Sequence, residues 1–546
     1  MNMKVDSMIF LPECLENIFK FLQDDEEALF SSILVNRFWC RTLVPILWRN
    51  PFRLVKEANT DKLINIYVRC LSNDNEPDYL SDLVILKDGQ NVLQKLLKNS
   101  SRLTFDYPYF LRELKCSKIN DLVKRWLSSV IDDSNWNKPD QKEFCVKWFS
   151  NNLIRLFMNK SPNVESLVIQ SDDYHHNADF SFNSCTDKGY SALRILHLDY
   201  CCDGHTLQSI SFNCHSIEEL WISLTENSRE TQSLNELVKS QKGIKDFRIR
   251  SIYYNEKVFE VTPQLLEALS IQKRTLHTVQ FFCCKFHQCP TLQPLAECTK
   301  LERLGFFNCD GLTEEVIKPL ANGSLRNLNV LAMAVYDGFT EKVIIDIIES
   351  SHQNLKRISL PMATKTNNIR NVFTSMIPFV NNLTGITVCF SSGDNKSFES
   401  FLLLLDSCSN LESLCIEGGD TAGNPLDFDD KEMSIYFEQL AIKMPLSINR
   451  LVFYNVSVSS QLFQTFLEKL DSPIRFLGLY GCFMIRDDHI NEIVKYAERT
   501  GHLKNLTVNW CFSNTGKAVD EALKVIDEVH FSDVEPYDME FTAWLA

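Results

Sequence analysis

From Pro162 onward, one short apolar pattern returns along the chain at a nearly constant distance. Each copy consists of an apolar residue, two variable residues, a second apolar residue, one variable residue and a third apolar residue. Thirteen copies occur, and their first apolar residues are Val164, Leu193, Ile217, Ile244, Leu276, Leu301, Leu328, Leu355, Leu383, Leu411, Ile448, Ile474 and Leu503. The intervals between them average about 28 residues, a period typical of architectures built from stacked repeats. Because each repeat contacts only its neighbours, we predict an elongated solenoid.

The apolar residues at alternate positions within each copy predict a short strand that turns one face inward. Helical segments that start at Thr313, Thr340, Ser460 and Asp487 lie between copies, and Thr, Ser and Asp are favoured N-cap residues. One strand and one helix per copy predict an α/β fold with parallel strands inside and helices outside. A period of roughly 20–29 residues with this apolar pattern is typical of leucine-rich repeats.

Cysteines recur at two fixed positions of the repeat. Those eight residues after the first apolar residue of a copy are Cys201, Cys284, Cys309, Cys482 and Cys511. Those three residues before a copy begins are Cys214, Cys298 and Cys408. This register resembles the cysteine-containing subclass of leucine-rich repeats. We interpret these thiols as small apolar groups inside the repeat core.

The start of the chain carries a different pattern, that of three short helices. Leu15, Ile18, Phe19 and Leu22 have i, i+3, i+4 and i+7 spacing, which places them on one stripe of a helix. Two further helical segments follow before residue 49. Three helices in about forty residues cannot bury all of their apolar side chains among themselves. We therefore expect part of this apolar surface to contact a partner.

Several of these residues form a motif when taken together. They are Leu11-Pro12, then Leu15, Ile18, Phe19 and Leu22, and then Val35, Arg37, Trp39 and Leu47-Trp48. With these residues the segment resembles the F-box, whose pattern is a leading Leu-Pro, an apolar helix, a Val-x-Arg-x-Trp stretch and a closing Leu-Trp. It departs from the pattern at Pro45, which we expect to kink or shorten the third helix.

The resemblance implies a partner and a role. F-boxes bind the Skp-type adaptor of SCF-type cullin–RING ubiquitin ligases, and through it the cullin, while the rest of the chain binds the protein to be ubiquitinated. By resemblance, the adaptor contact is assigned to Leu11, Pro12, Leu15, Ile18, Phe19, Leu22, Val35, Trp39, Leu47 and Trp48. The alternative is that these helices only cap the apolar end of the repeats.

These patterns divide the chain into four expected segments. They are an F-box-like domain at 1–52, a helical lead-in or degenerate repeats at 53–161, the solenoid at 162–513, and a C-terminal cap with an acidic tail at 514–546. The longest interval between copies is the 37 residues before Ile448. We predict a protruding loop there, at residues 418–430.

Composition excludes several classes of function. The formal net charge of −15 argues against binding nucleic acid, because such binding depends on Lys and Arg that neutralise phosphates. No segment has the roughly 18 apolar residues of a membrane span, and the N-terminal stretch is not a signal peptide. We therefore expect a protein of the cytoplasm or nucleus with no nucleic-acid or membrane partner. Its 19 cysteines are expected to be free thiols.

Two clusters of soft side chains are candidate zinc sites. They are Cys283, Cys284, His287 and Cys289, and His197, Cys201, Cys202 and His205. We expect neither to bind metal, because Cys201 and Cys284 occupy inward-facing positions and no cysteine pair has C-x2-C spacing. Gly-rich phosphate loops and the H-E-x-x-H and G-x-S-x-G motifs are also missing from the sequence. We expect no metal, no cofactor and no catalytic residue.

The concave face of the solenoid is the predicted substrate-binding surface. Residues two, four and six positions after the first apolar residue of each copy should line this face. Among them are Glu219, Trp221, Arg248, Arg250, Phe282, Arg303, Phe307, Tyr454 and Tyr480. Trp, Arg and large aromatic residues dominate the energetics of protein interfaces. The alternative is that these side chains only fill space, and that the convex helices or the loop at 418–430 bind instead.

Together these features favour the substrate-recognition subunit of an SCF-type ubiquitin ligase, a receptor that does no chemistry itself. It would act by holding a substrate lysine near the charged ubiquitin-conjugating enzyme. The main alternative is a leucine-rich-repeat scaffold that binds a protein and has no role in a ubiquitin ligase.

Overall fold

In the computed structural model, the chain divides into two compact units, Met1–Ile244 and Lys245–Ala546. The structure describes residues 17–19, 21, 25–54, 59–72, 103–130, 139–169, 191–198, 204–224, 228–252, 258–334, 341–360, 369–391, 395–419, 425–482, 484–509 and 516–532. The unit boundary falls within the segment predicted as one solenoid, 162–513.

The first unit begins with short helices whose starts are capped by side chains. Its first named helices are α2 (Glu26–Ile33), α3 (Arg37–Leu47) and α4 (Pro51–Leu54). The Asp25 carboxylate accepts a hydrogen bond from the backbone N–H of Ala28, and the Asn36 side chain accepts one from Trp39, both at 2.9 Å. Helix α3 contains Pro45 and ends two residues beyond it, at Leu47.

The lead-in of the first unit is mainly helical and has a core of aromatic residues. Its elements are α5 (Thr60–Ser72), η3 (Tyr107–Phe110), β1 (Glu113–Lys115), α8 (Cys116–Val130) and α9 (Pro139–Lys160). Tyr67, Trp126 and Phe157 are fully buried there. Strand β1 pairs with the first predicted strand, so the sheet begins about fifty residues earlier than the expected start of the solenoid.

Three predicted repeat strands follow in the first unit. They are β2 (Ser166–Ile169), β3 (Ile195–Leu198) and β4 (Glu219–Leu224), with helices α10 (Gly204–Asn213) and α11 (Ser228–Ser240). Strands β1 to β4 pair in chain order, and every pair is parallel.

The described part of the second unit contains one long parallel sheet. Its strands, in order, are β5 (Asp246–Ser251), β6 (Thr278–Phe282), β7 (Arg303–Phe307), β8 (Val330–Ala334), β9 (Arg357–Ser359), β10 (Gly385–Phe390), β11 (Ser413–Gly418), β13 (Arg450–Tyr454), β15 (Phe476–Tyr480), β16 (Asn505–Asn509) and β17 (Glu528–Ser532). Strand β17 lies in the predicted C-terminal cap and extends the sheet by one strand beyond the last predicted copy.

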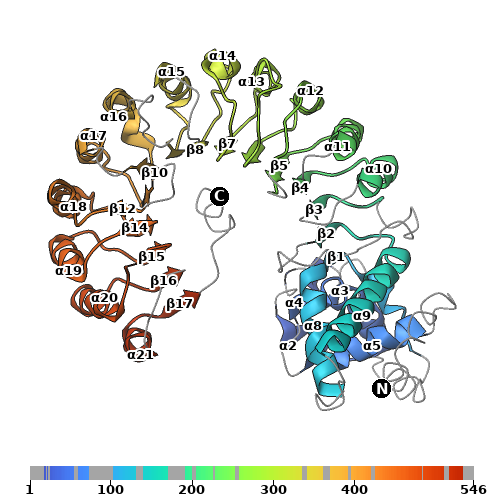
Figure 1. The fold of residues 1–546 in the computed structure, drawn as a ribbon. Helices are drawn as coiled ribbons and strands as arrows, with labels where there is room; N and C mark the ends of the chain where they lie inside the picture. Colours follow the sequence, from blue (N-terminus) through green and yellow to red (C-terminus); the bar gives the residue numbers. More distant parts are fainter. Residues whose placement is uncertain are drawn as a thin grey trace, which may run out of the picture. The chain divides into compact units, whose positions relative to one another are not determined.

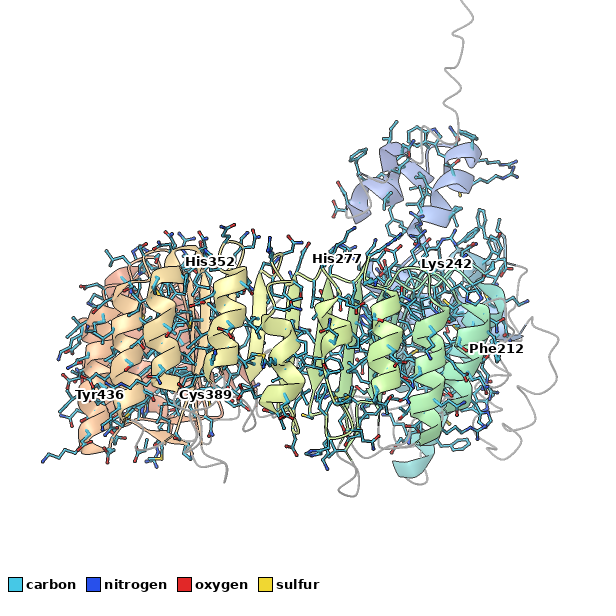
Figure 2. All side chains as sticks on the ribbon, turned by 90° about the horizontal axis from the view of Figure 1, so that it is seen from above. Phe212, Lys242, His277, His352, Cys389 and Tyr436 are labelled. Atoms are coloured by element: carbon cyan, nitrogen blue, oxygen red, sulfur yellow. The ribbon has the colours of Figure 1, made fainter. Side chains whose placement is uncertain are left out.

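Helices cover the outer face of this sheet and leave the strands on the inner, concave side (Figure 1). They are α12 (Pro263–Ile271), α13 (Gln293–Ala296), α14 (Glu314–Ile317), η7 (Lys318–Ala321), α15 (Glu341–Ser351), α16 (Ile369–Met376), η8 (Ile377–Asn382), α17 (Asn395–Asp406), α18 (Lys431–Lys443), α19 (Ser460–Lys469), α20 (Asp487–Thr500) and α21 (Gly516–Val525). In Figure 2 the outer helices stand side by side along the unit.

All thirteen predicted copies form strands, and the leucine-rich-repeat solenoid is confirmed as the fold. The middle apolar residue of every copy is at most 2% exposed. This burial follows from the two-residue period of a strand, which turns the apolar positions toward the helices. Among the described residues, no helix is both long enough and apolar enough to cross a membrane.

The repeats are joined by two ladders of hydrogen bonds. In the backbone ladder, one carbonyl before most of the strands accepts two N–H groups of the next repeat. The Thr384 carbonyl, for example, accepts those of Glu412 and Ser413 at 2.9 and 3.0 Å. In the side-chain ladder, asparagine amides donate to a carbonyl of the preceding repeat. These amides belong to Asn327, Asn354, Asn382 and Asn410, each directly before the first apolar residue of its copy.

The register of the cysteines has a structural cause. The residue after strand β7, Asn308, has a left-handed backbone with φ of 50°, and Gly481 after β15 has φ of 61°. This turn directs the next residue inward, where the buried thiols of Cys309 and Cys482 donate to backbone carbonyls. Cys201 and Cys511 lie outside the described residues.

The predicted loop at 418–430 differs from the expectation in its described part. Strand β12 (Leu426–Asp427) pairs with β14 (Val456–Ser457), and Leu426 and Phe428 are fully buried. The second half of the segment therefore packs on the repeat instead of protruding, because its two apolar side chains enter the core.

Replacing a core residue of the ladder should destabilise the second unit locally. Leu414 in β11 is fully buried, so Leu414→Ala is expected to lower the free energy of local opening by about 2–5 kcal/mol. Hydrogen exchange of the β10, β11 and β13 amides measures this change. Leu403→Ala on α17, where the side chain is 50% exposed, is the matched control and should change it by less than about 0.5 kcal/mol. Equal effects of the two substitutions would contradict the assignment of the core.

Candidate protein-binding surfaces

The N-terminal helices keep a set of large apolar side chains in contact with solvent. We call this set the N-terminal apolar residues; they are Ile18, Phe21, Phe30, Leu34, Val35 and Phe38, with exposures from 40% to 90%. Phe30 and Leu34 are one helical turn apart on one side of the chain. Large apolar side chains that gather at one part of a surface mark a site of protein interaction.

The same helices bury a different set of apolar residues. Phe19, Leu29 and Leu43 are at most 3% exposed and form an internal cluster. Ile33, Trp39, Ile46 and Leu47 pack against it, and the Phe19 and Trp39 rings meet edge to face with centroids 5.5 Å apart. A segment this short has room for only one interior, and the apolar side chains that point elsewhere remain exposed.

The residues predicted for the adaptor contact therefore separate into groups. Ile18 and Val35 are 46% and 58% exposed, whereas Phe19 is 3% exposed and packs inside the helices. Trp39 and Leu47 pack against the internal cluster. Leu11, Pro12, Leu15 and Leu22 lie outside the described residues. The sequence-based prediction did not include Phe21, Phe30, Leu34 and Phe38. A large apolar residue that lies outside the apolar stripe of its helix would have indicated such exposed positions.

The end of α3 is attached to the first strand of the first unit. The Arg49 carbonyl accepts hydrogen bonds from the N–H groups of Arg112 and Glu113, at 2.9 and 3.4 Å, as one carbonyl does between successive repeats. The ring of Trp48 packs on Tyr67 and Tyr107, with centroids 5.4 and 4.1 Å away. Residues 48–50 thus cover the edge of β1, while Leu34 and Val35 stay exposed.

In the first unit, the concave positions bring three polar and aromatic side chains together. Nε2 of His197 lies 2.7 Å from Oε1 of Glu219, and the His197 and Trp221 rings are 5.5 Å apart. Strand pairing places His197 directly beside Trp221. The two residues predicted here, Glu219 and Trp221, therefore form one small surface. His197 also belongs to this surface, although it was not among the predicted residues.

In the second unit, the concave positions of β6 to β8 and of β11 to β15 carry a buried apolar cluster. We call it the concave cluster; it consists of Phe282, Phe307, Val330, Ala332, Cys415, Val452 and Tyr480, with Tyr454 and Phe476 packed against it. The Phe282 and Phe307 rings stack at 4.6 Å. Four of the predicted residues, Phe282, Phe307, Tyr454 and Tyr480, meet in this cluster.

Two glycines shape this cluster. A Cβ atom at Gly305 would lie 2.5 Å from the Phe307 ring, and one at Gly478 would lie 2.6 Å from the Tyr480 ring. Each ring can therefore fold down over its own strand only because a glycine precedes it by two residues. The rings lie flat as a result, and the cluster is closely packed.

The predicted arginines have different environments. Arg303 shares one row of paired positions with Arg357 and Arg450, beside the concave cluster. The Arg450 guanidinium lies 3.8 Å from the centre of the Phe476 ring. Arg248 makes two hydrogen bonds of 2.9 Å to the Asp246 carboxylate, and Arg250 is 8% exposed.

One carboxyl group on this face has an unusual environment. Glu417 in β11 lies between Cys389 and Tyr454 on the neighbouring strands. Burial raises the pKa of its carboxyl from the usual 4.5 to about 7. Burial also raises the thiol pKa of Cys389 and Cys415 well above the ordinary value.

The first candidate zinc cluster places its members in unlike surroundings. Cys284 and Cys289 are buried, and their thiols donate to the Phe282 and Val261 carbonyls. His287 is exposed and lies 3.2 Å from an Asp310 carboxylate oxygen. Across the residues that the structure describes, no three metal-binding side chains come together. Cys201 and Cys202 of the second cluster lie outside that part of the chain.

The raised pKa of Glu417 gives this carboxyl a contribution to stability that is present in mild acid and absent at neutral pH. In the unfolded chain this carboxyl loses its proton near pH 4.5, whereas in the folded chain it keeps the proton to about pH 7. The contribution of Glu417 to stability is therefore fully present below about pH 4.5 and is lost as pH rises from there to about 7. Glu417→Gln should raise Tm at pH 8 by roughly 2 °C or more and leave it nearly unchanged at pH 4.5. Calorimetry at both pH values measures the effect, and an equal shift at both would contradict it.

Comparisons with known proteins concern architecture alone. No protein-family model and no curated protein matches the chain. Among solved structures, the Rad7–Elc1 complex of yeast is similar, at 12% identity and a TM-score of 0.40 over 80% of this chain and 95% of that one. LegL7, a leucine-rich-repeat-containing protein of Legionella pneumophila, is 11% identical, with a TM-score of 0.34 over 59% of this chain and 96% of that one. The TLR13–ssRNA13 complex is 13% identical, with a TM-score of 0.29 over 69% of this chain and 55% of that one. Similarity at this level carries no inference about binding partners.

Proposed function

We propose that the chain is the substrate-recognition subunit of an SCF-type cullin–RING ubiquitin ligase. In this proposal the N-terminal helices bind a Skp-type adaptor, and the leucine-rich repeats bind the protein to be ubiquitinated. The observation that carries it is the exposure of Phe30, Leu34 and Val35 on helices whose interior is already filled. The F-box-like motif of the same segment names the kind of partner that this surface would bind.

The proposed mechanism is proximity. A receptor that holds both adaptor and substrate raises the effective concentration of a substrate lysine near the charged ubiquitin-conjugating enzyme. The chain supplies no reacting group and no cofactor in this scheme. Its contribution is the distance and orientation set by a stacked array of repeats.

The second candidate is a leucine-rich-repeat scaffold that binds a protein without any ligase. One observation favours it: the Arg49 carbonyl and the Trp48 ring seal the edge of β1 as a cap would. Trp48, assigned to the adaptor contact by resemblance, takes part in this cap, whereas Leu34 and Val35 do not, so the cap alone does not decide between the two functions. A measurement of adaptor binding distinguishes the two functions.

Adaptor binding should depend on the exposed residues of the N-terminal helices. Leu34 is 85% exposed, and burying a leucine at an interface contributes about 1.5–3 kcal/mol. Because an aspartate would be desolvated there as well, Leu34→Asp should weaken the binding of a recombinant Skp-type adaptor at least roughly 100-fold. Isothermal titration with the full chain measures the affinity.

Leu446→Asp is the matched control for this experiment. Leu446 is 69% exposed in the second unit, so the same chemical change falls on a surface outside the N-terminal helices. This variant should bind the adaptor as the unchanged chain does. If the unchanged, folded chain fails to bind the adaptor, the ligase proposal is lost and the scaffold remains.

A further inference from the structure

The concave cluster has the low exposure of a protein core. Its seven members are 1–7% exposed, although the outer helices of the second unit lie on the opposite face of the sheet. Parallel sheets occur almost only with both faces covered. Stacking of Phe282 on Phe307 and packing of Tyr480 over Gly478 involve only three of the seven members. A flat apolar floor of this kind fits an extended apolar chain laid across it.

Cationic side chains border the cluster. Arg303, Arg357 and Arg450 share one row of paired positions at the starts of β7, β9 and β13. Arg450 already packs over the Phe476 ring at the edge of the cluster. A segment that occupied the floor would therefore benefit from carrying carboxylates next to its apolar residues.

The chain itself contains a segment with this chemistry. Fourteen residues follow Ser532, and they include no Lys or Arg. Their acidic residues are Asp533, Glu535, Asp538 and Glu540. Their large apolar residues are Val534, Tyr537, Met539, Phe541, Trp544 and Leu545. Acidic and apolar residues thus alternate in the first half, and the last six residues are apolar apart from Thr542.

This segment also has the necessary reach. It continues from β17, which pairs with β16 and through it with β15, where Phe476 and Tyr480 belong to the cluster. Fourteen extended residues span at most about 46 Å. The distance from β17 to β7 is eight strand spacings, about 38 Å along the sheet. Every member of the cluster from Tyr480 to Phe307 is therefore within reach.

We propose that residues 533–546 dock across the concave cluster of the second unit as an intramolecular ligand. The apolar side chains of the segment contact the floor, and its carboxylates lie along the row of arginines. A protein that binds this part of the concave face must displace the segment or bind on top of it. The proposal does not depend on a role in a ubiquitin ligase.

Cysteines on the two faces of the sheet provide the test. Cys389 and Cys415 lie on the concave face, whereas Cys284, Cys309 and Cys482 are buried on the helix side of the same sheet. Full-length chain and a chain that ends at Ser532 are alkylated under native conditions, and mass spectrometry gives the rate at each cysteine. We expect truncation to speed alkylation of Cys389 and Cys415 at least tenfold and to leave the three core thiols unchanged.

Synthetic peptides complete the experiment. A peptide of residues 533–546 in excess should restore slow alkylation of the truncated chain. A peptide of equal charge with Phe541, Trp544 and Leu545 replaced by serine should not. Unchanged rates at Cys389 and Cys415 after truncation would overturn the proposal.

If alkylation of the core thiols also becomes faster, truncation has unfolded part of the second unit. The full-length variant with Phe541→Ser and Trp544→Ser is then used in place of the truncated chain. The same tenfold increase confined to the concave thiols is then required. Its absence would also overturn the proposal.

Discussion

The interaction on which this molecule depends is the constant parallel register between successive strands. Within the second unit, Gly385, Ser413, Arg450, Phe476 and Asn505 pair in one row, and the neighbouring rows keep the same alignment. Because the register does not drift, equivalent positions of every repeat lie next to one another. Two rows turn inward and build the core with the helices, and the other rows form a surface. The chemistry of that surface is therefore determined by the side chains that occupy each row.

The N-terminal helices show how one short segment serves two neighbours. Its last residues join the hydrogen-bond ladder through the Arg49 carbonyl and protect the first strand from solvent. Its interior is completed by Phe19, Leu29 and Leu43. Leu34 and Val35 are used by neither and stay 85% and 58% exposed. The proposed adaptor contact is therefore compatible with the cap, since Leu34 and Val35 take no part in the contacts of Trp48 and Arg49 with the lead-in.

The concave faces of the two units differ in chemistry. In the first unit, His197, Glu219 and Trp221 form a small half-buried polar and aromatic group. In the second unit, the rings of Phe307 and Tyr480 lie over glycines and produce an apolar floor with arginines beside it. Burial of Glu417 on the same face adds a carboxyl group whose pKa, near 7, makes its charge sensitive to physiological pH. A ligand of the second unit would need apolar groups, whereas one of the first would need hydrogen-bond partners.

The thirteen repeat strands, their parallel order and the side of the sheet that their residues face could be predicted from sequence, because a periodic apolar pattern has only one register that buries it. Strands β1, β12 and β17 were not predicted, because they lie outside that period. The inward cysteines followed from the same period. Tertiary structure alone decided which apolar residues stay exposed: Ile18 and Phe19 are adjacent and share the predicted stripe, yet they are 46% and 3% exposed. It also decided that Phe282 and Phe307 stack, since their contact needs both the strand register and the missing side chain at Gly305. Local pattern determines the direction of a side chain, but its neighbours across the sheet determine whether solvent reaches it.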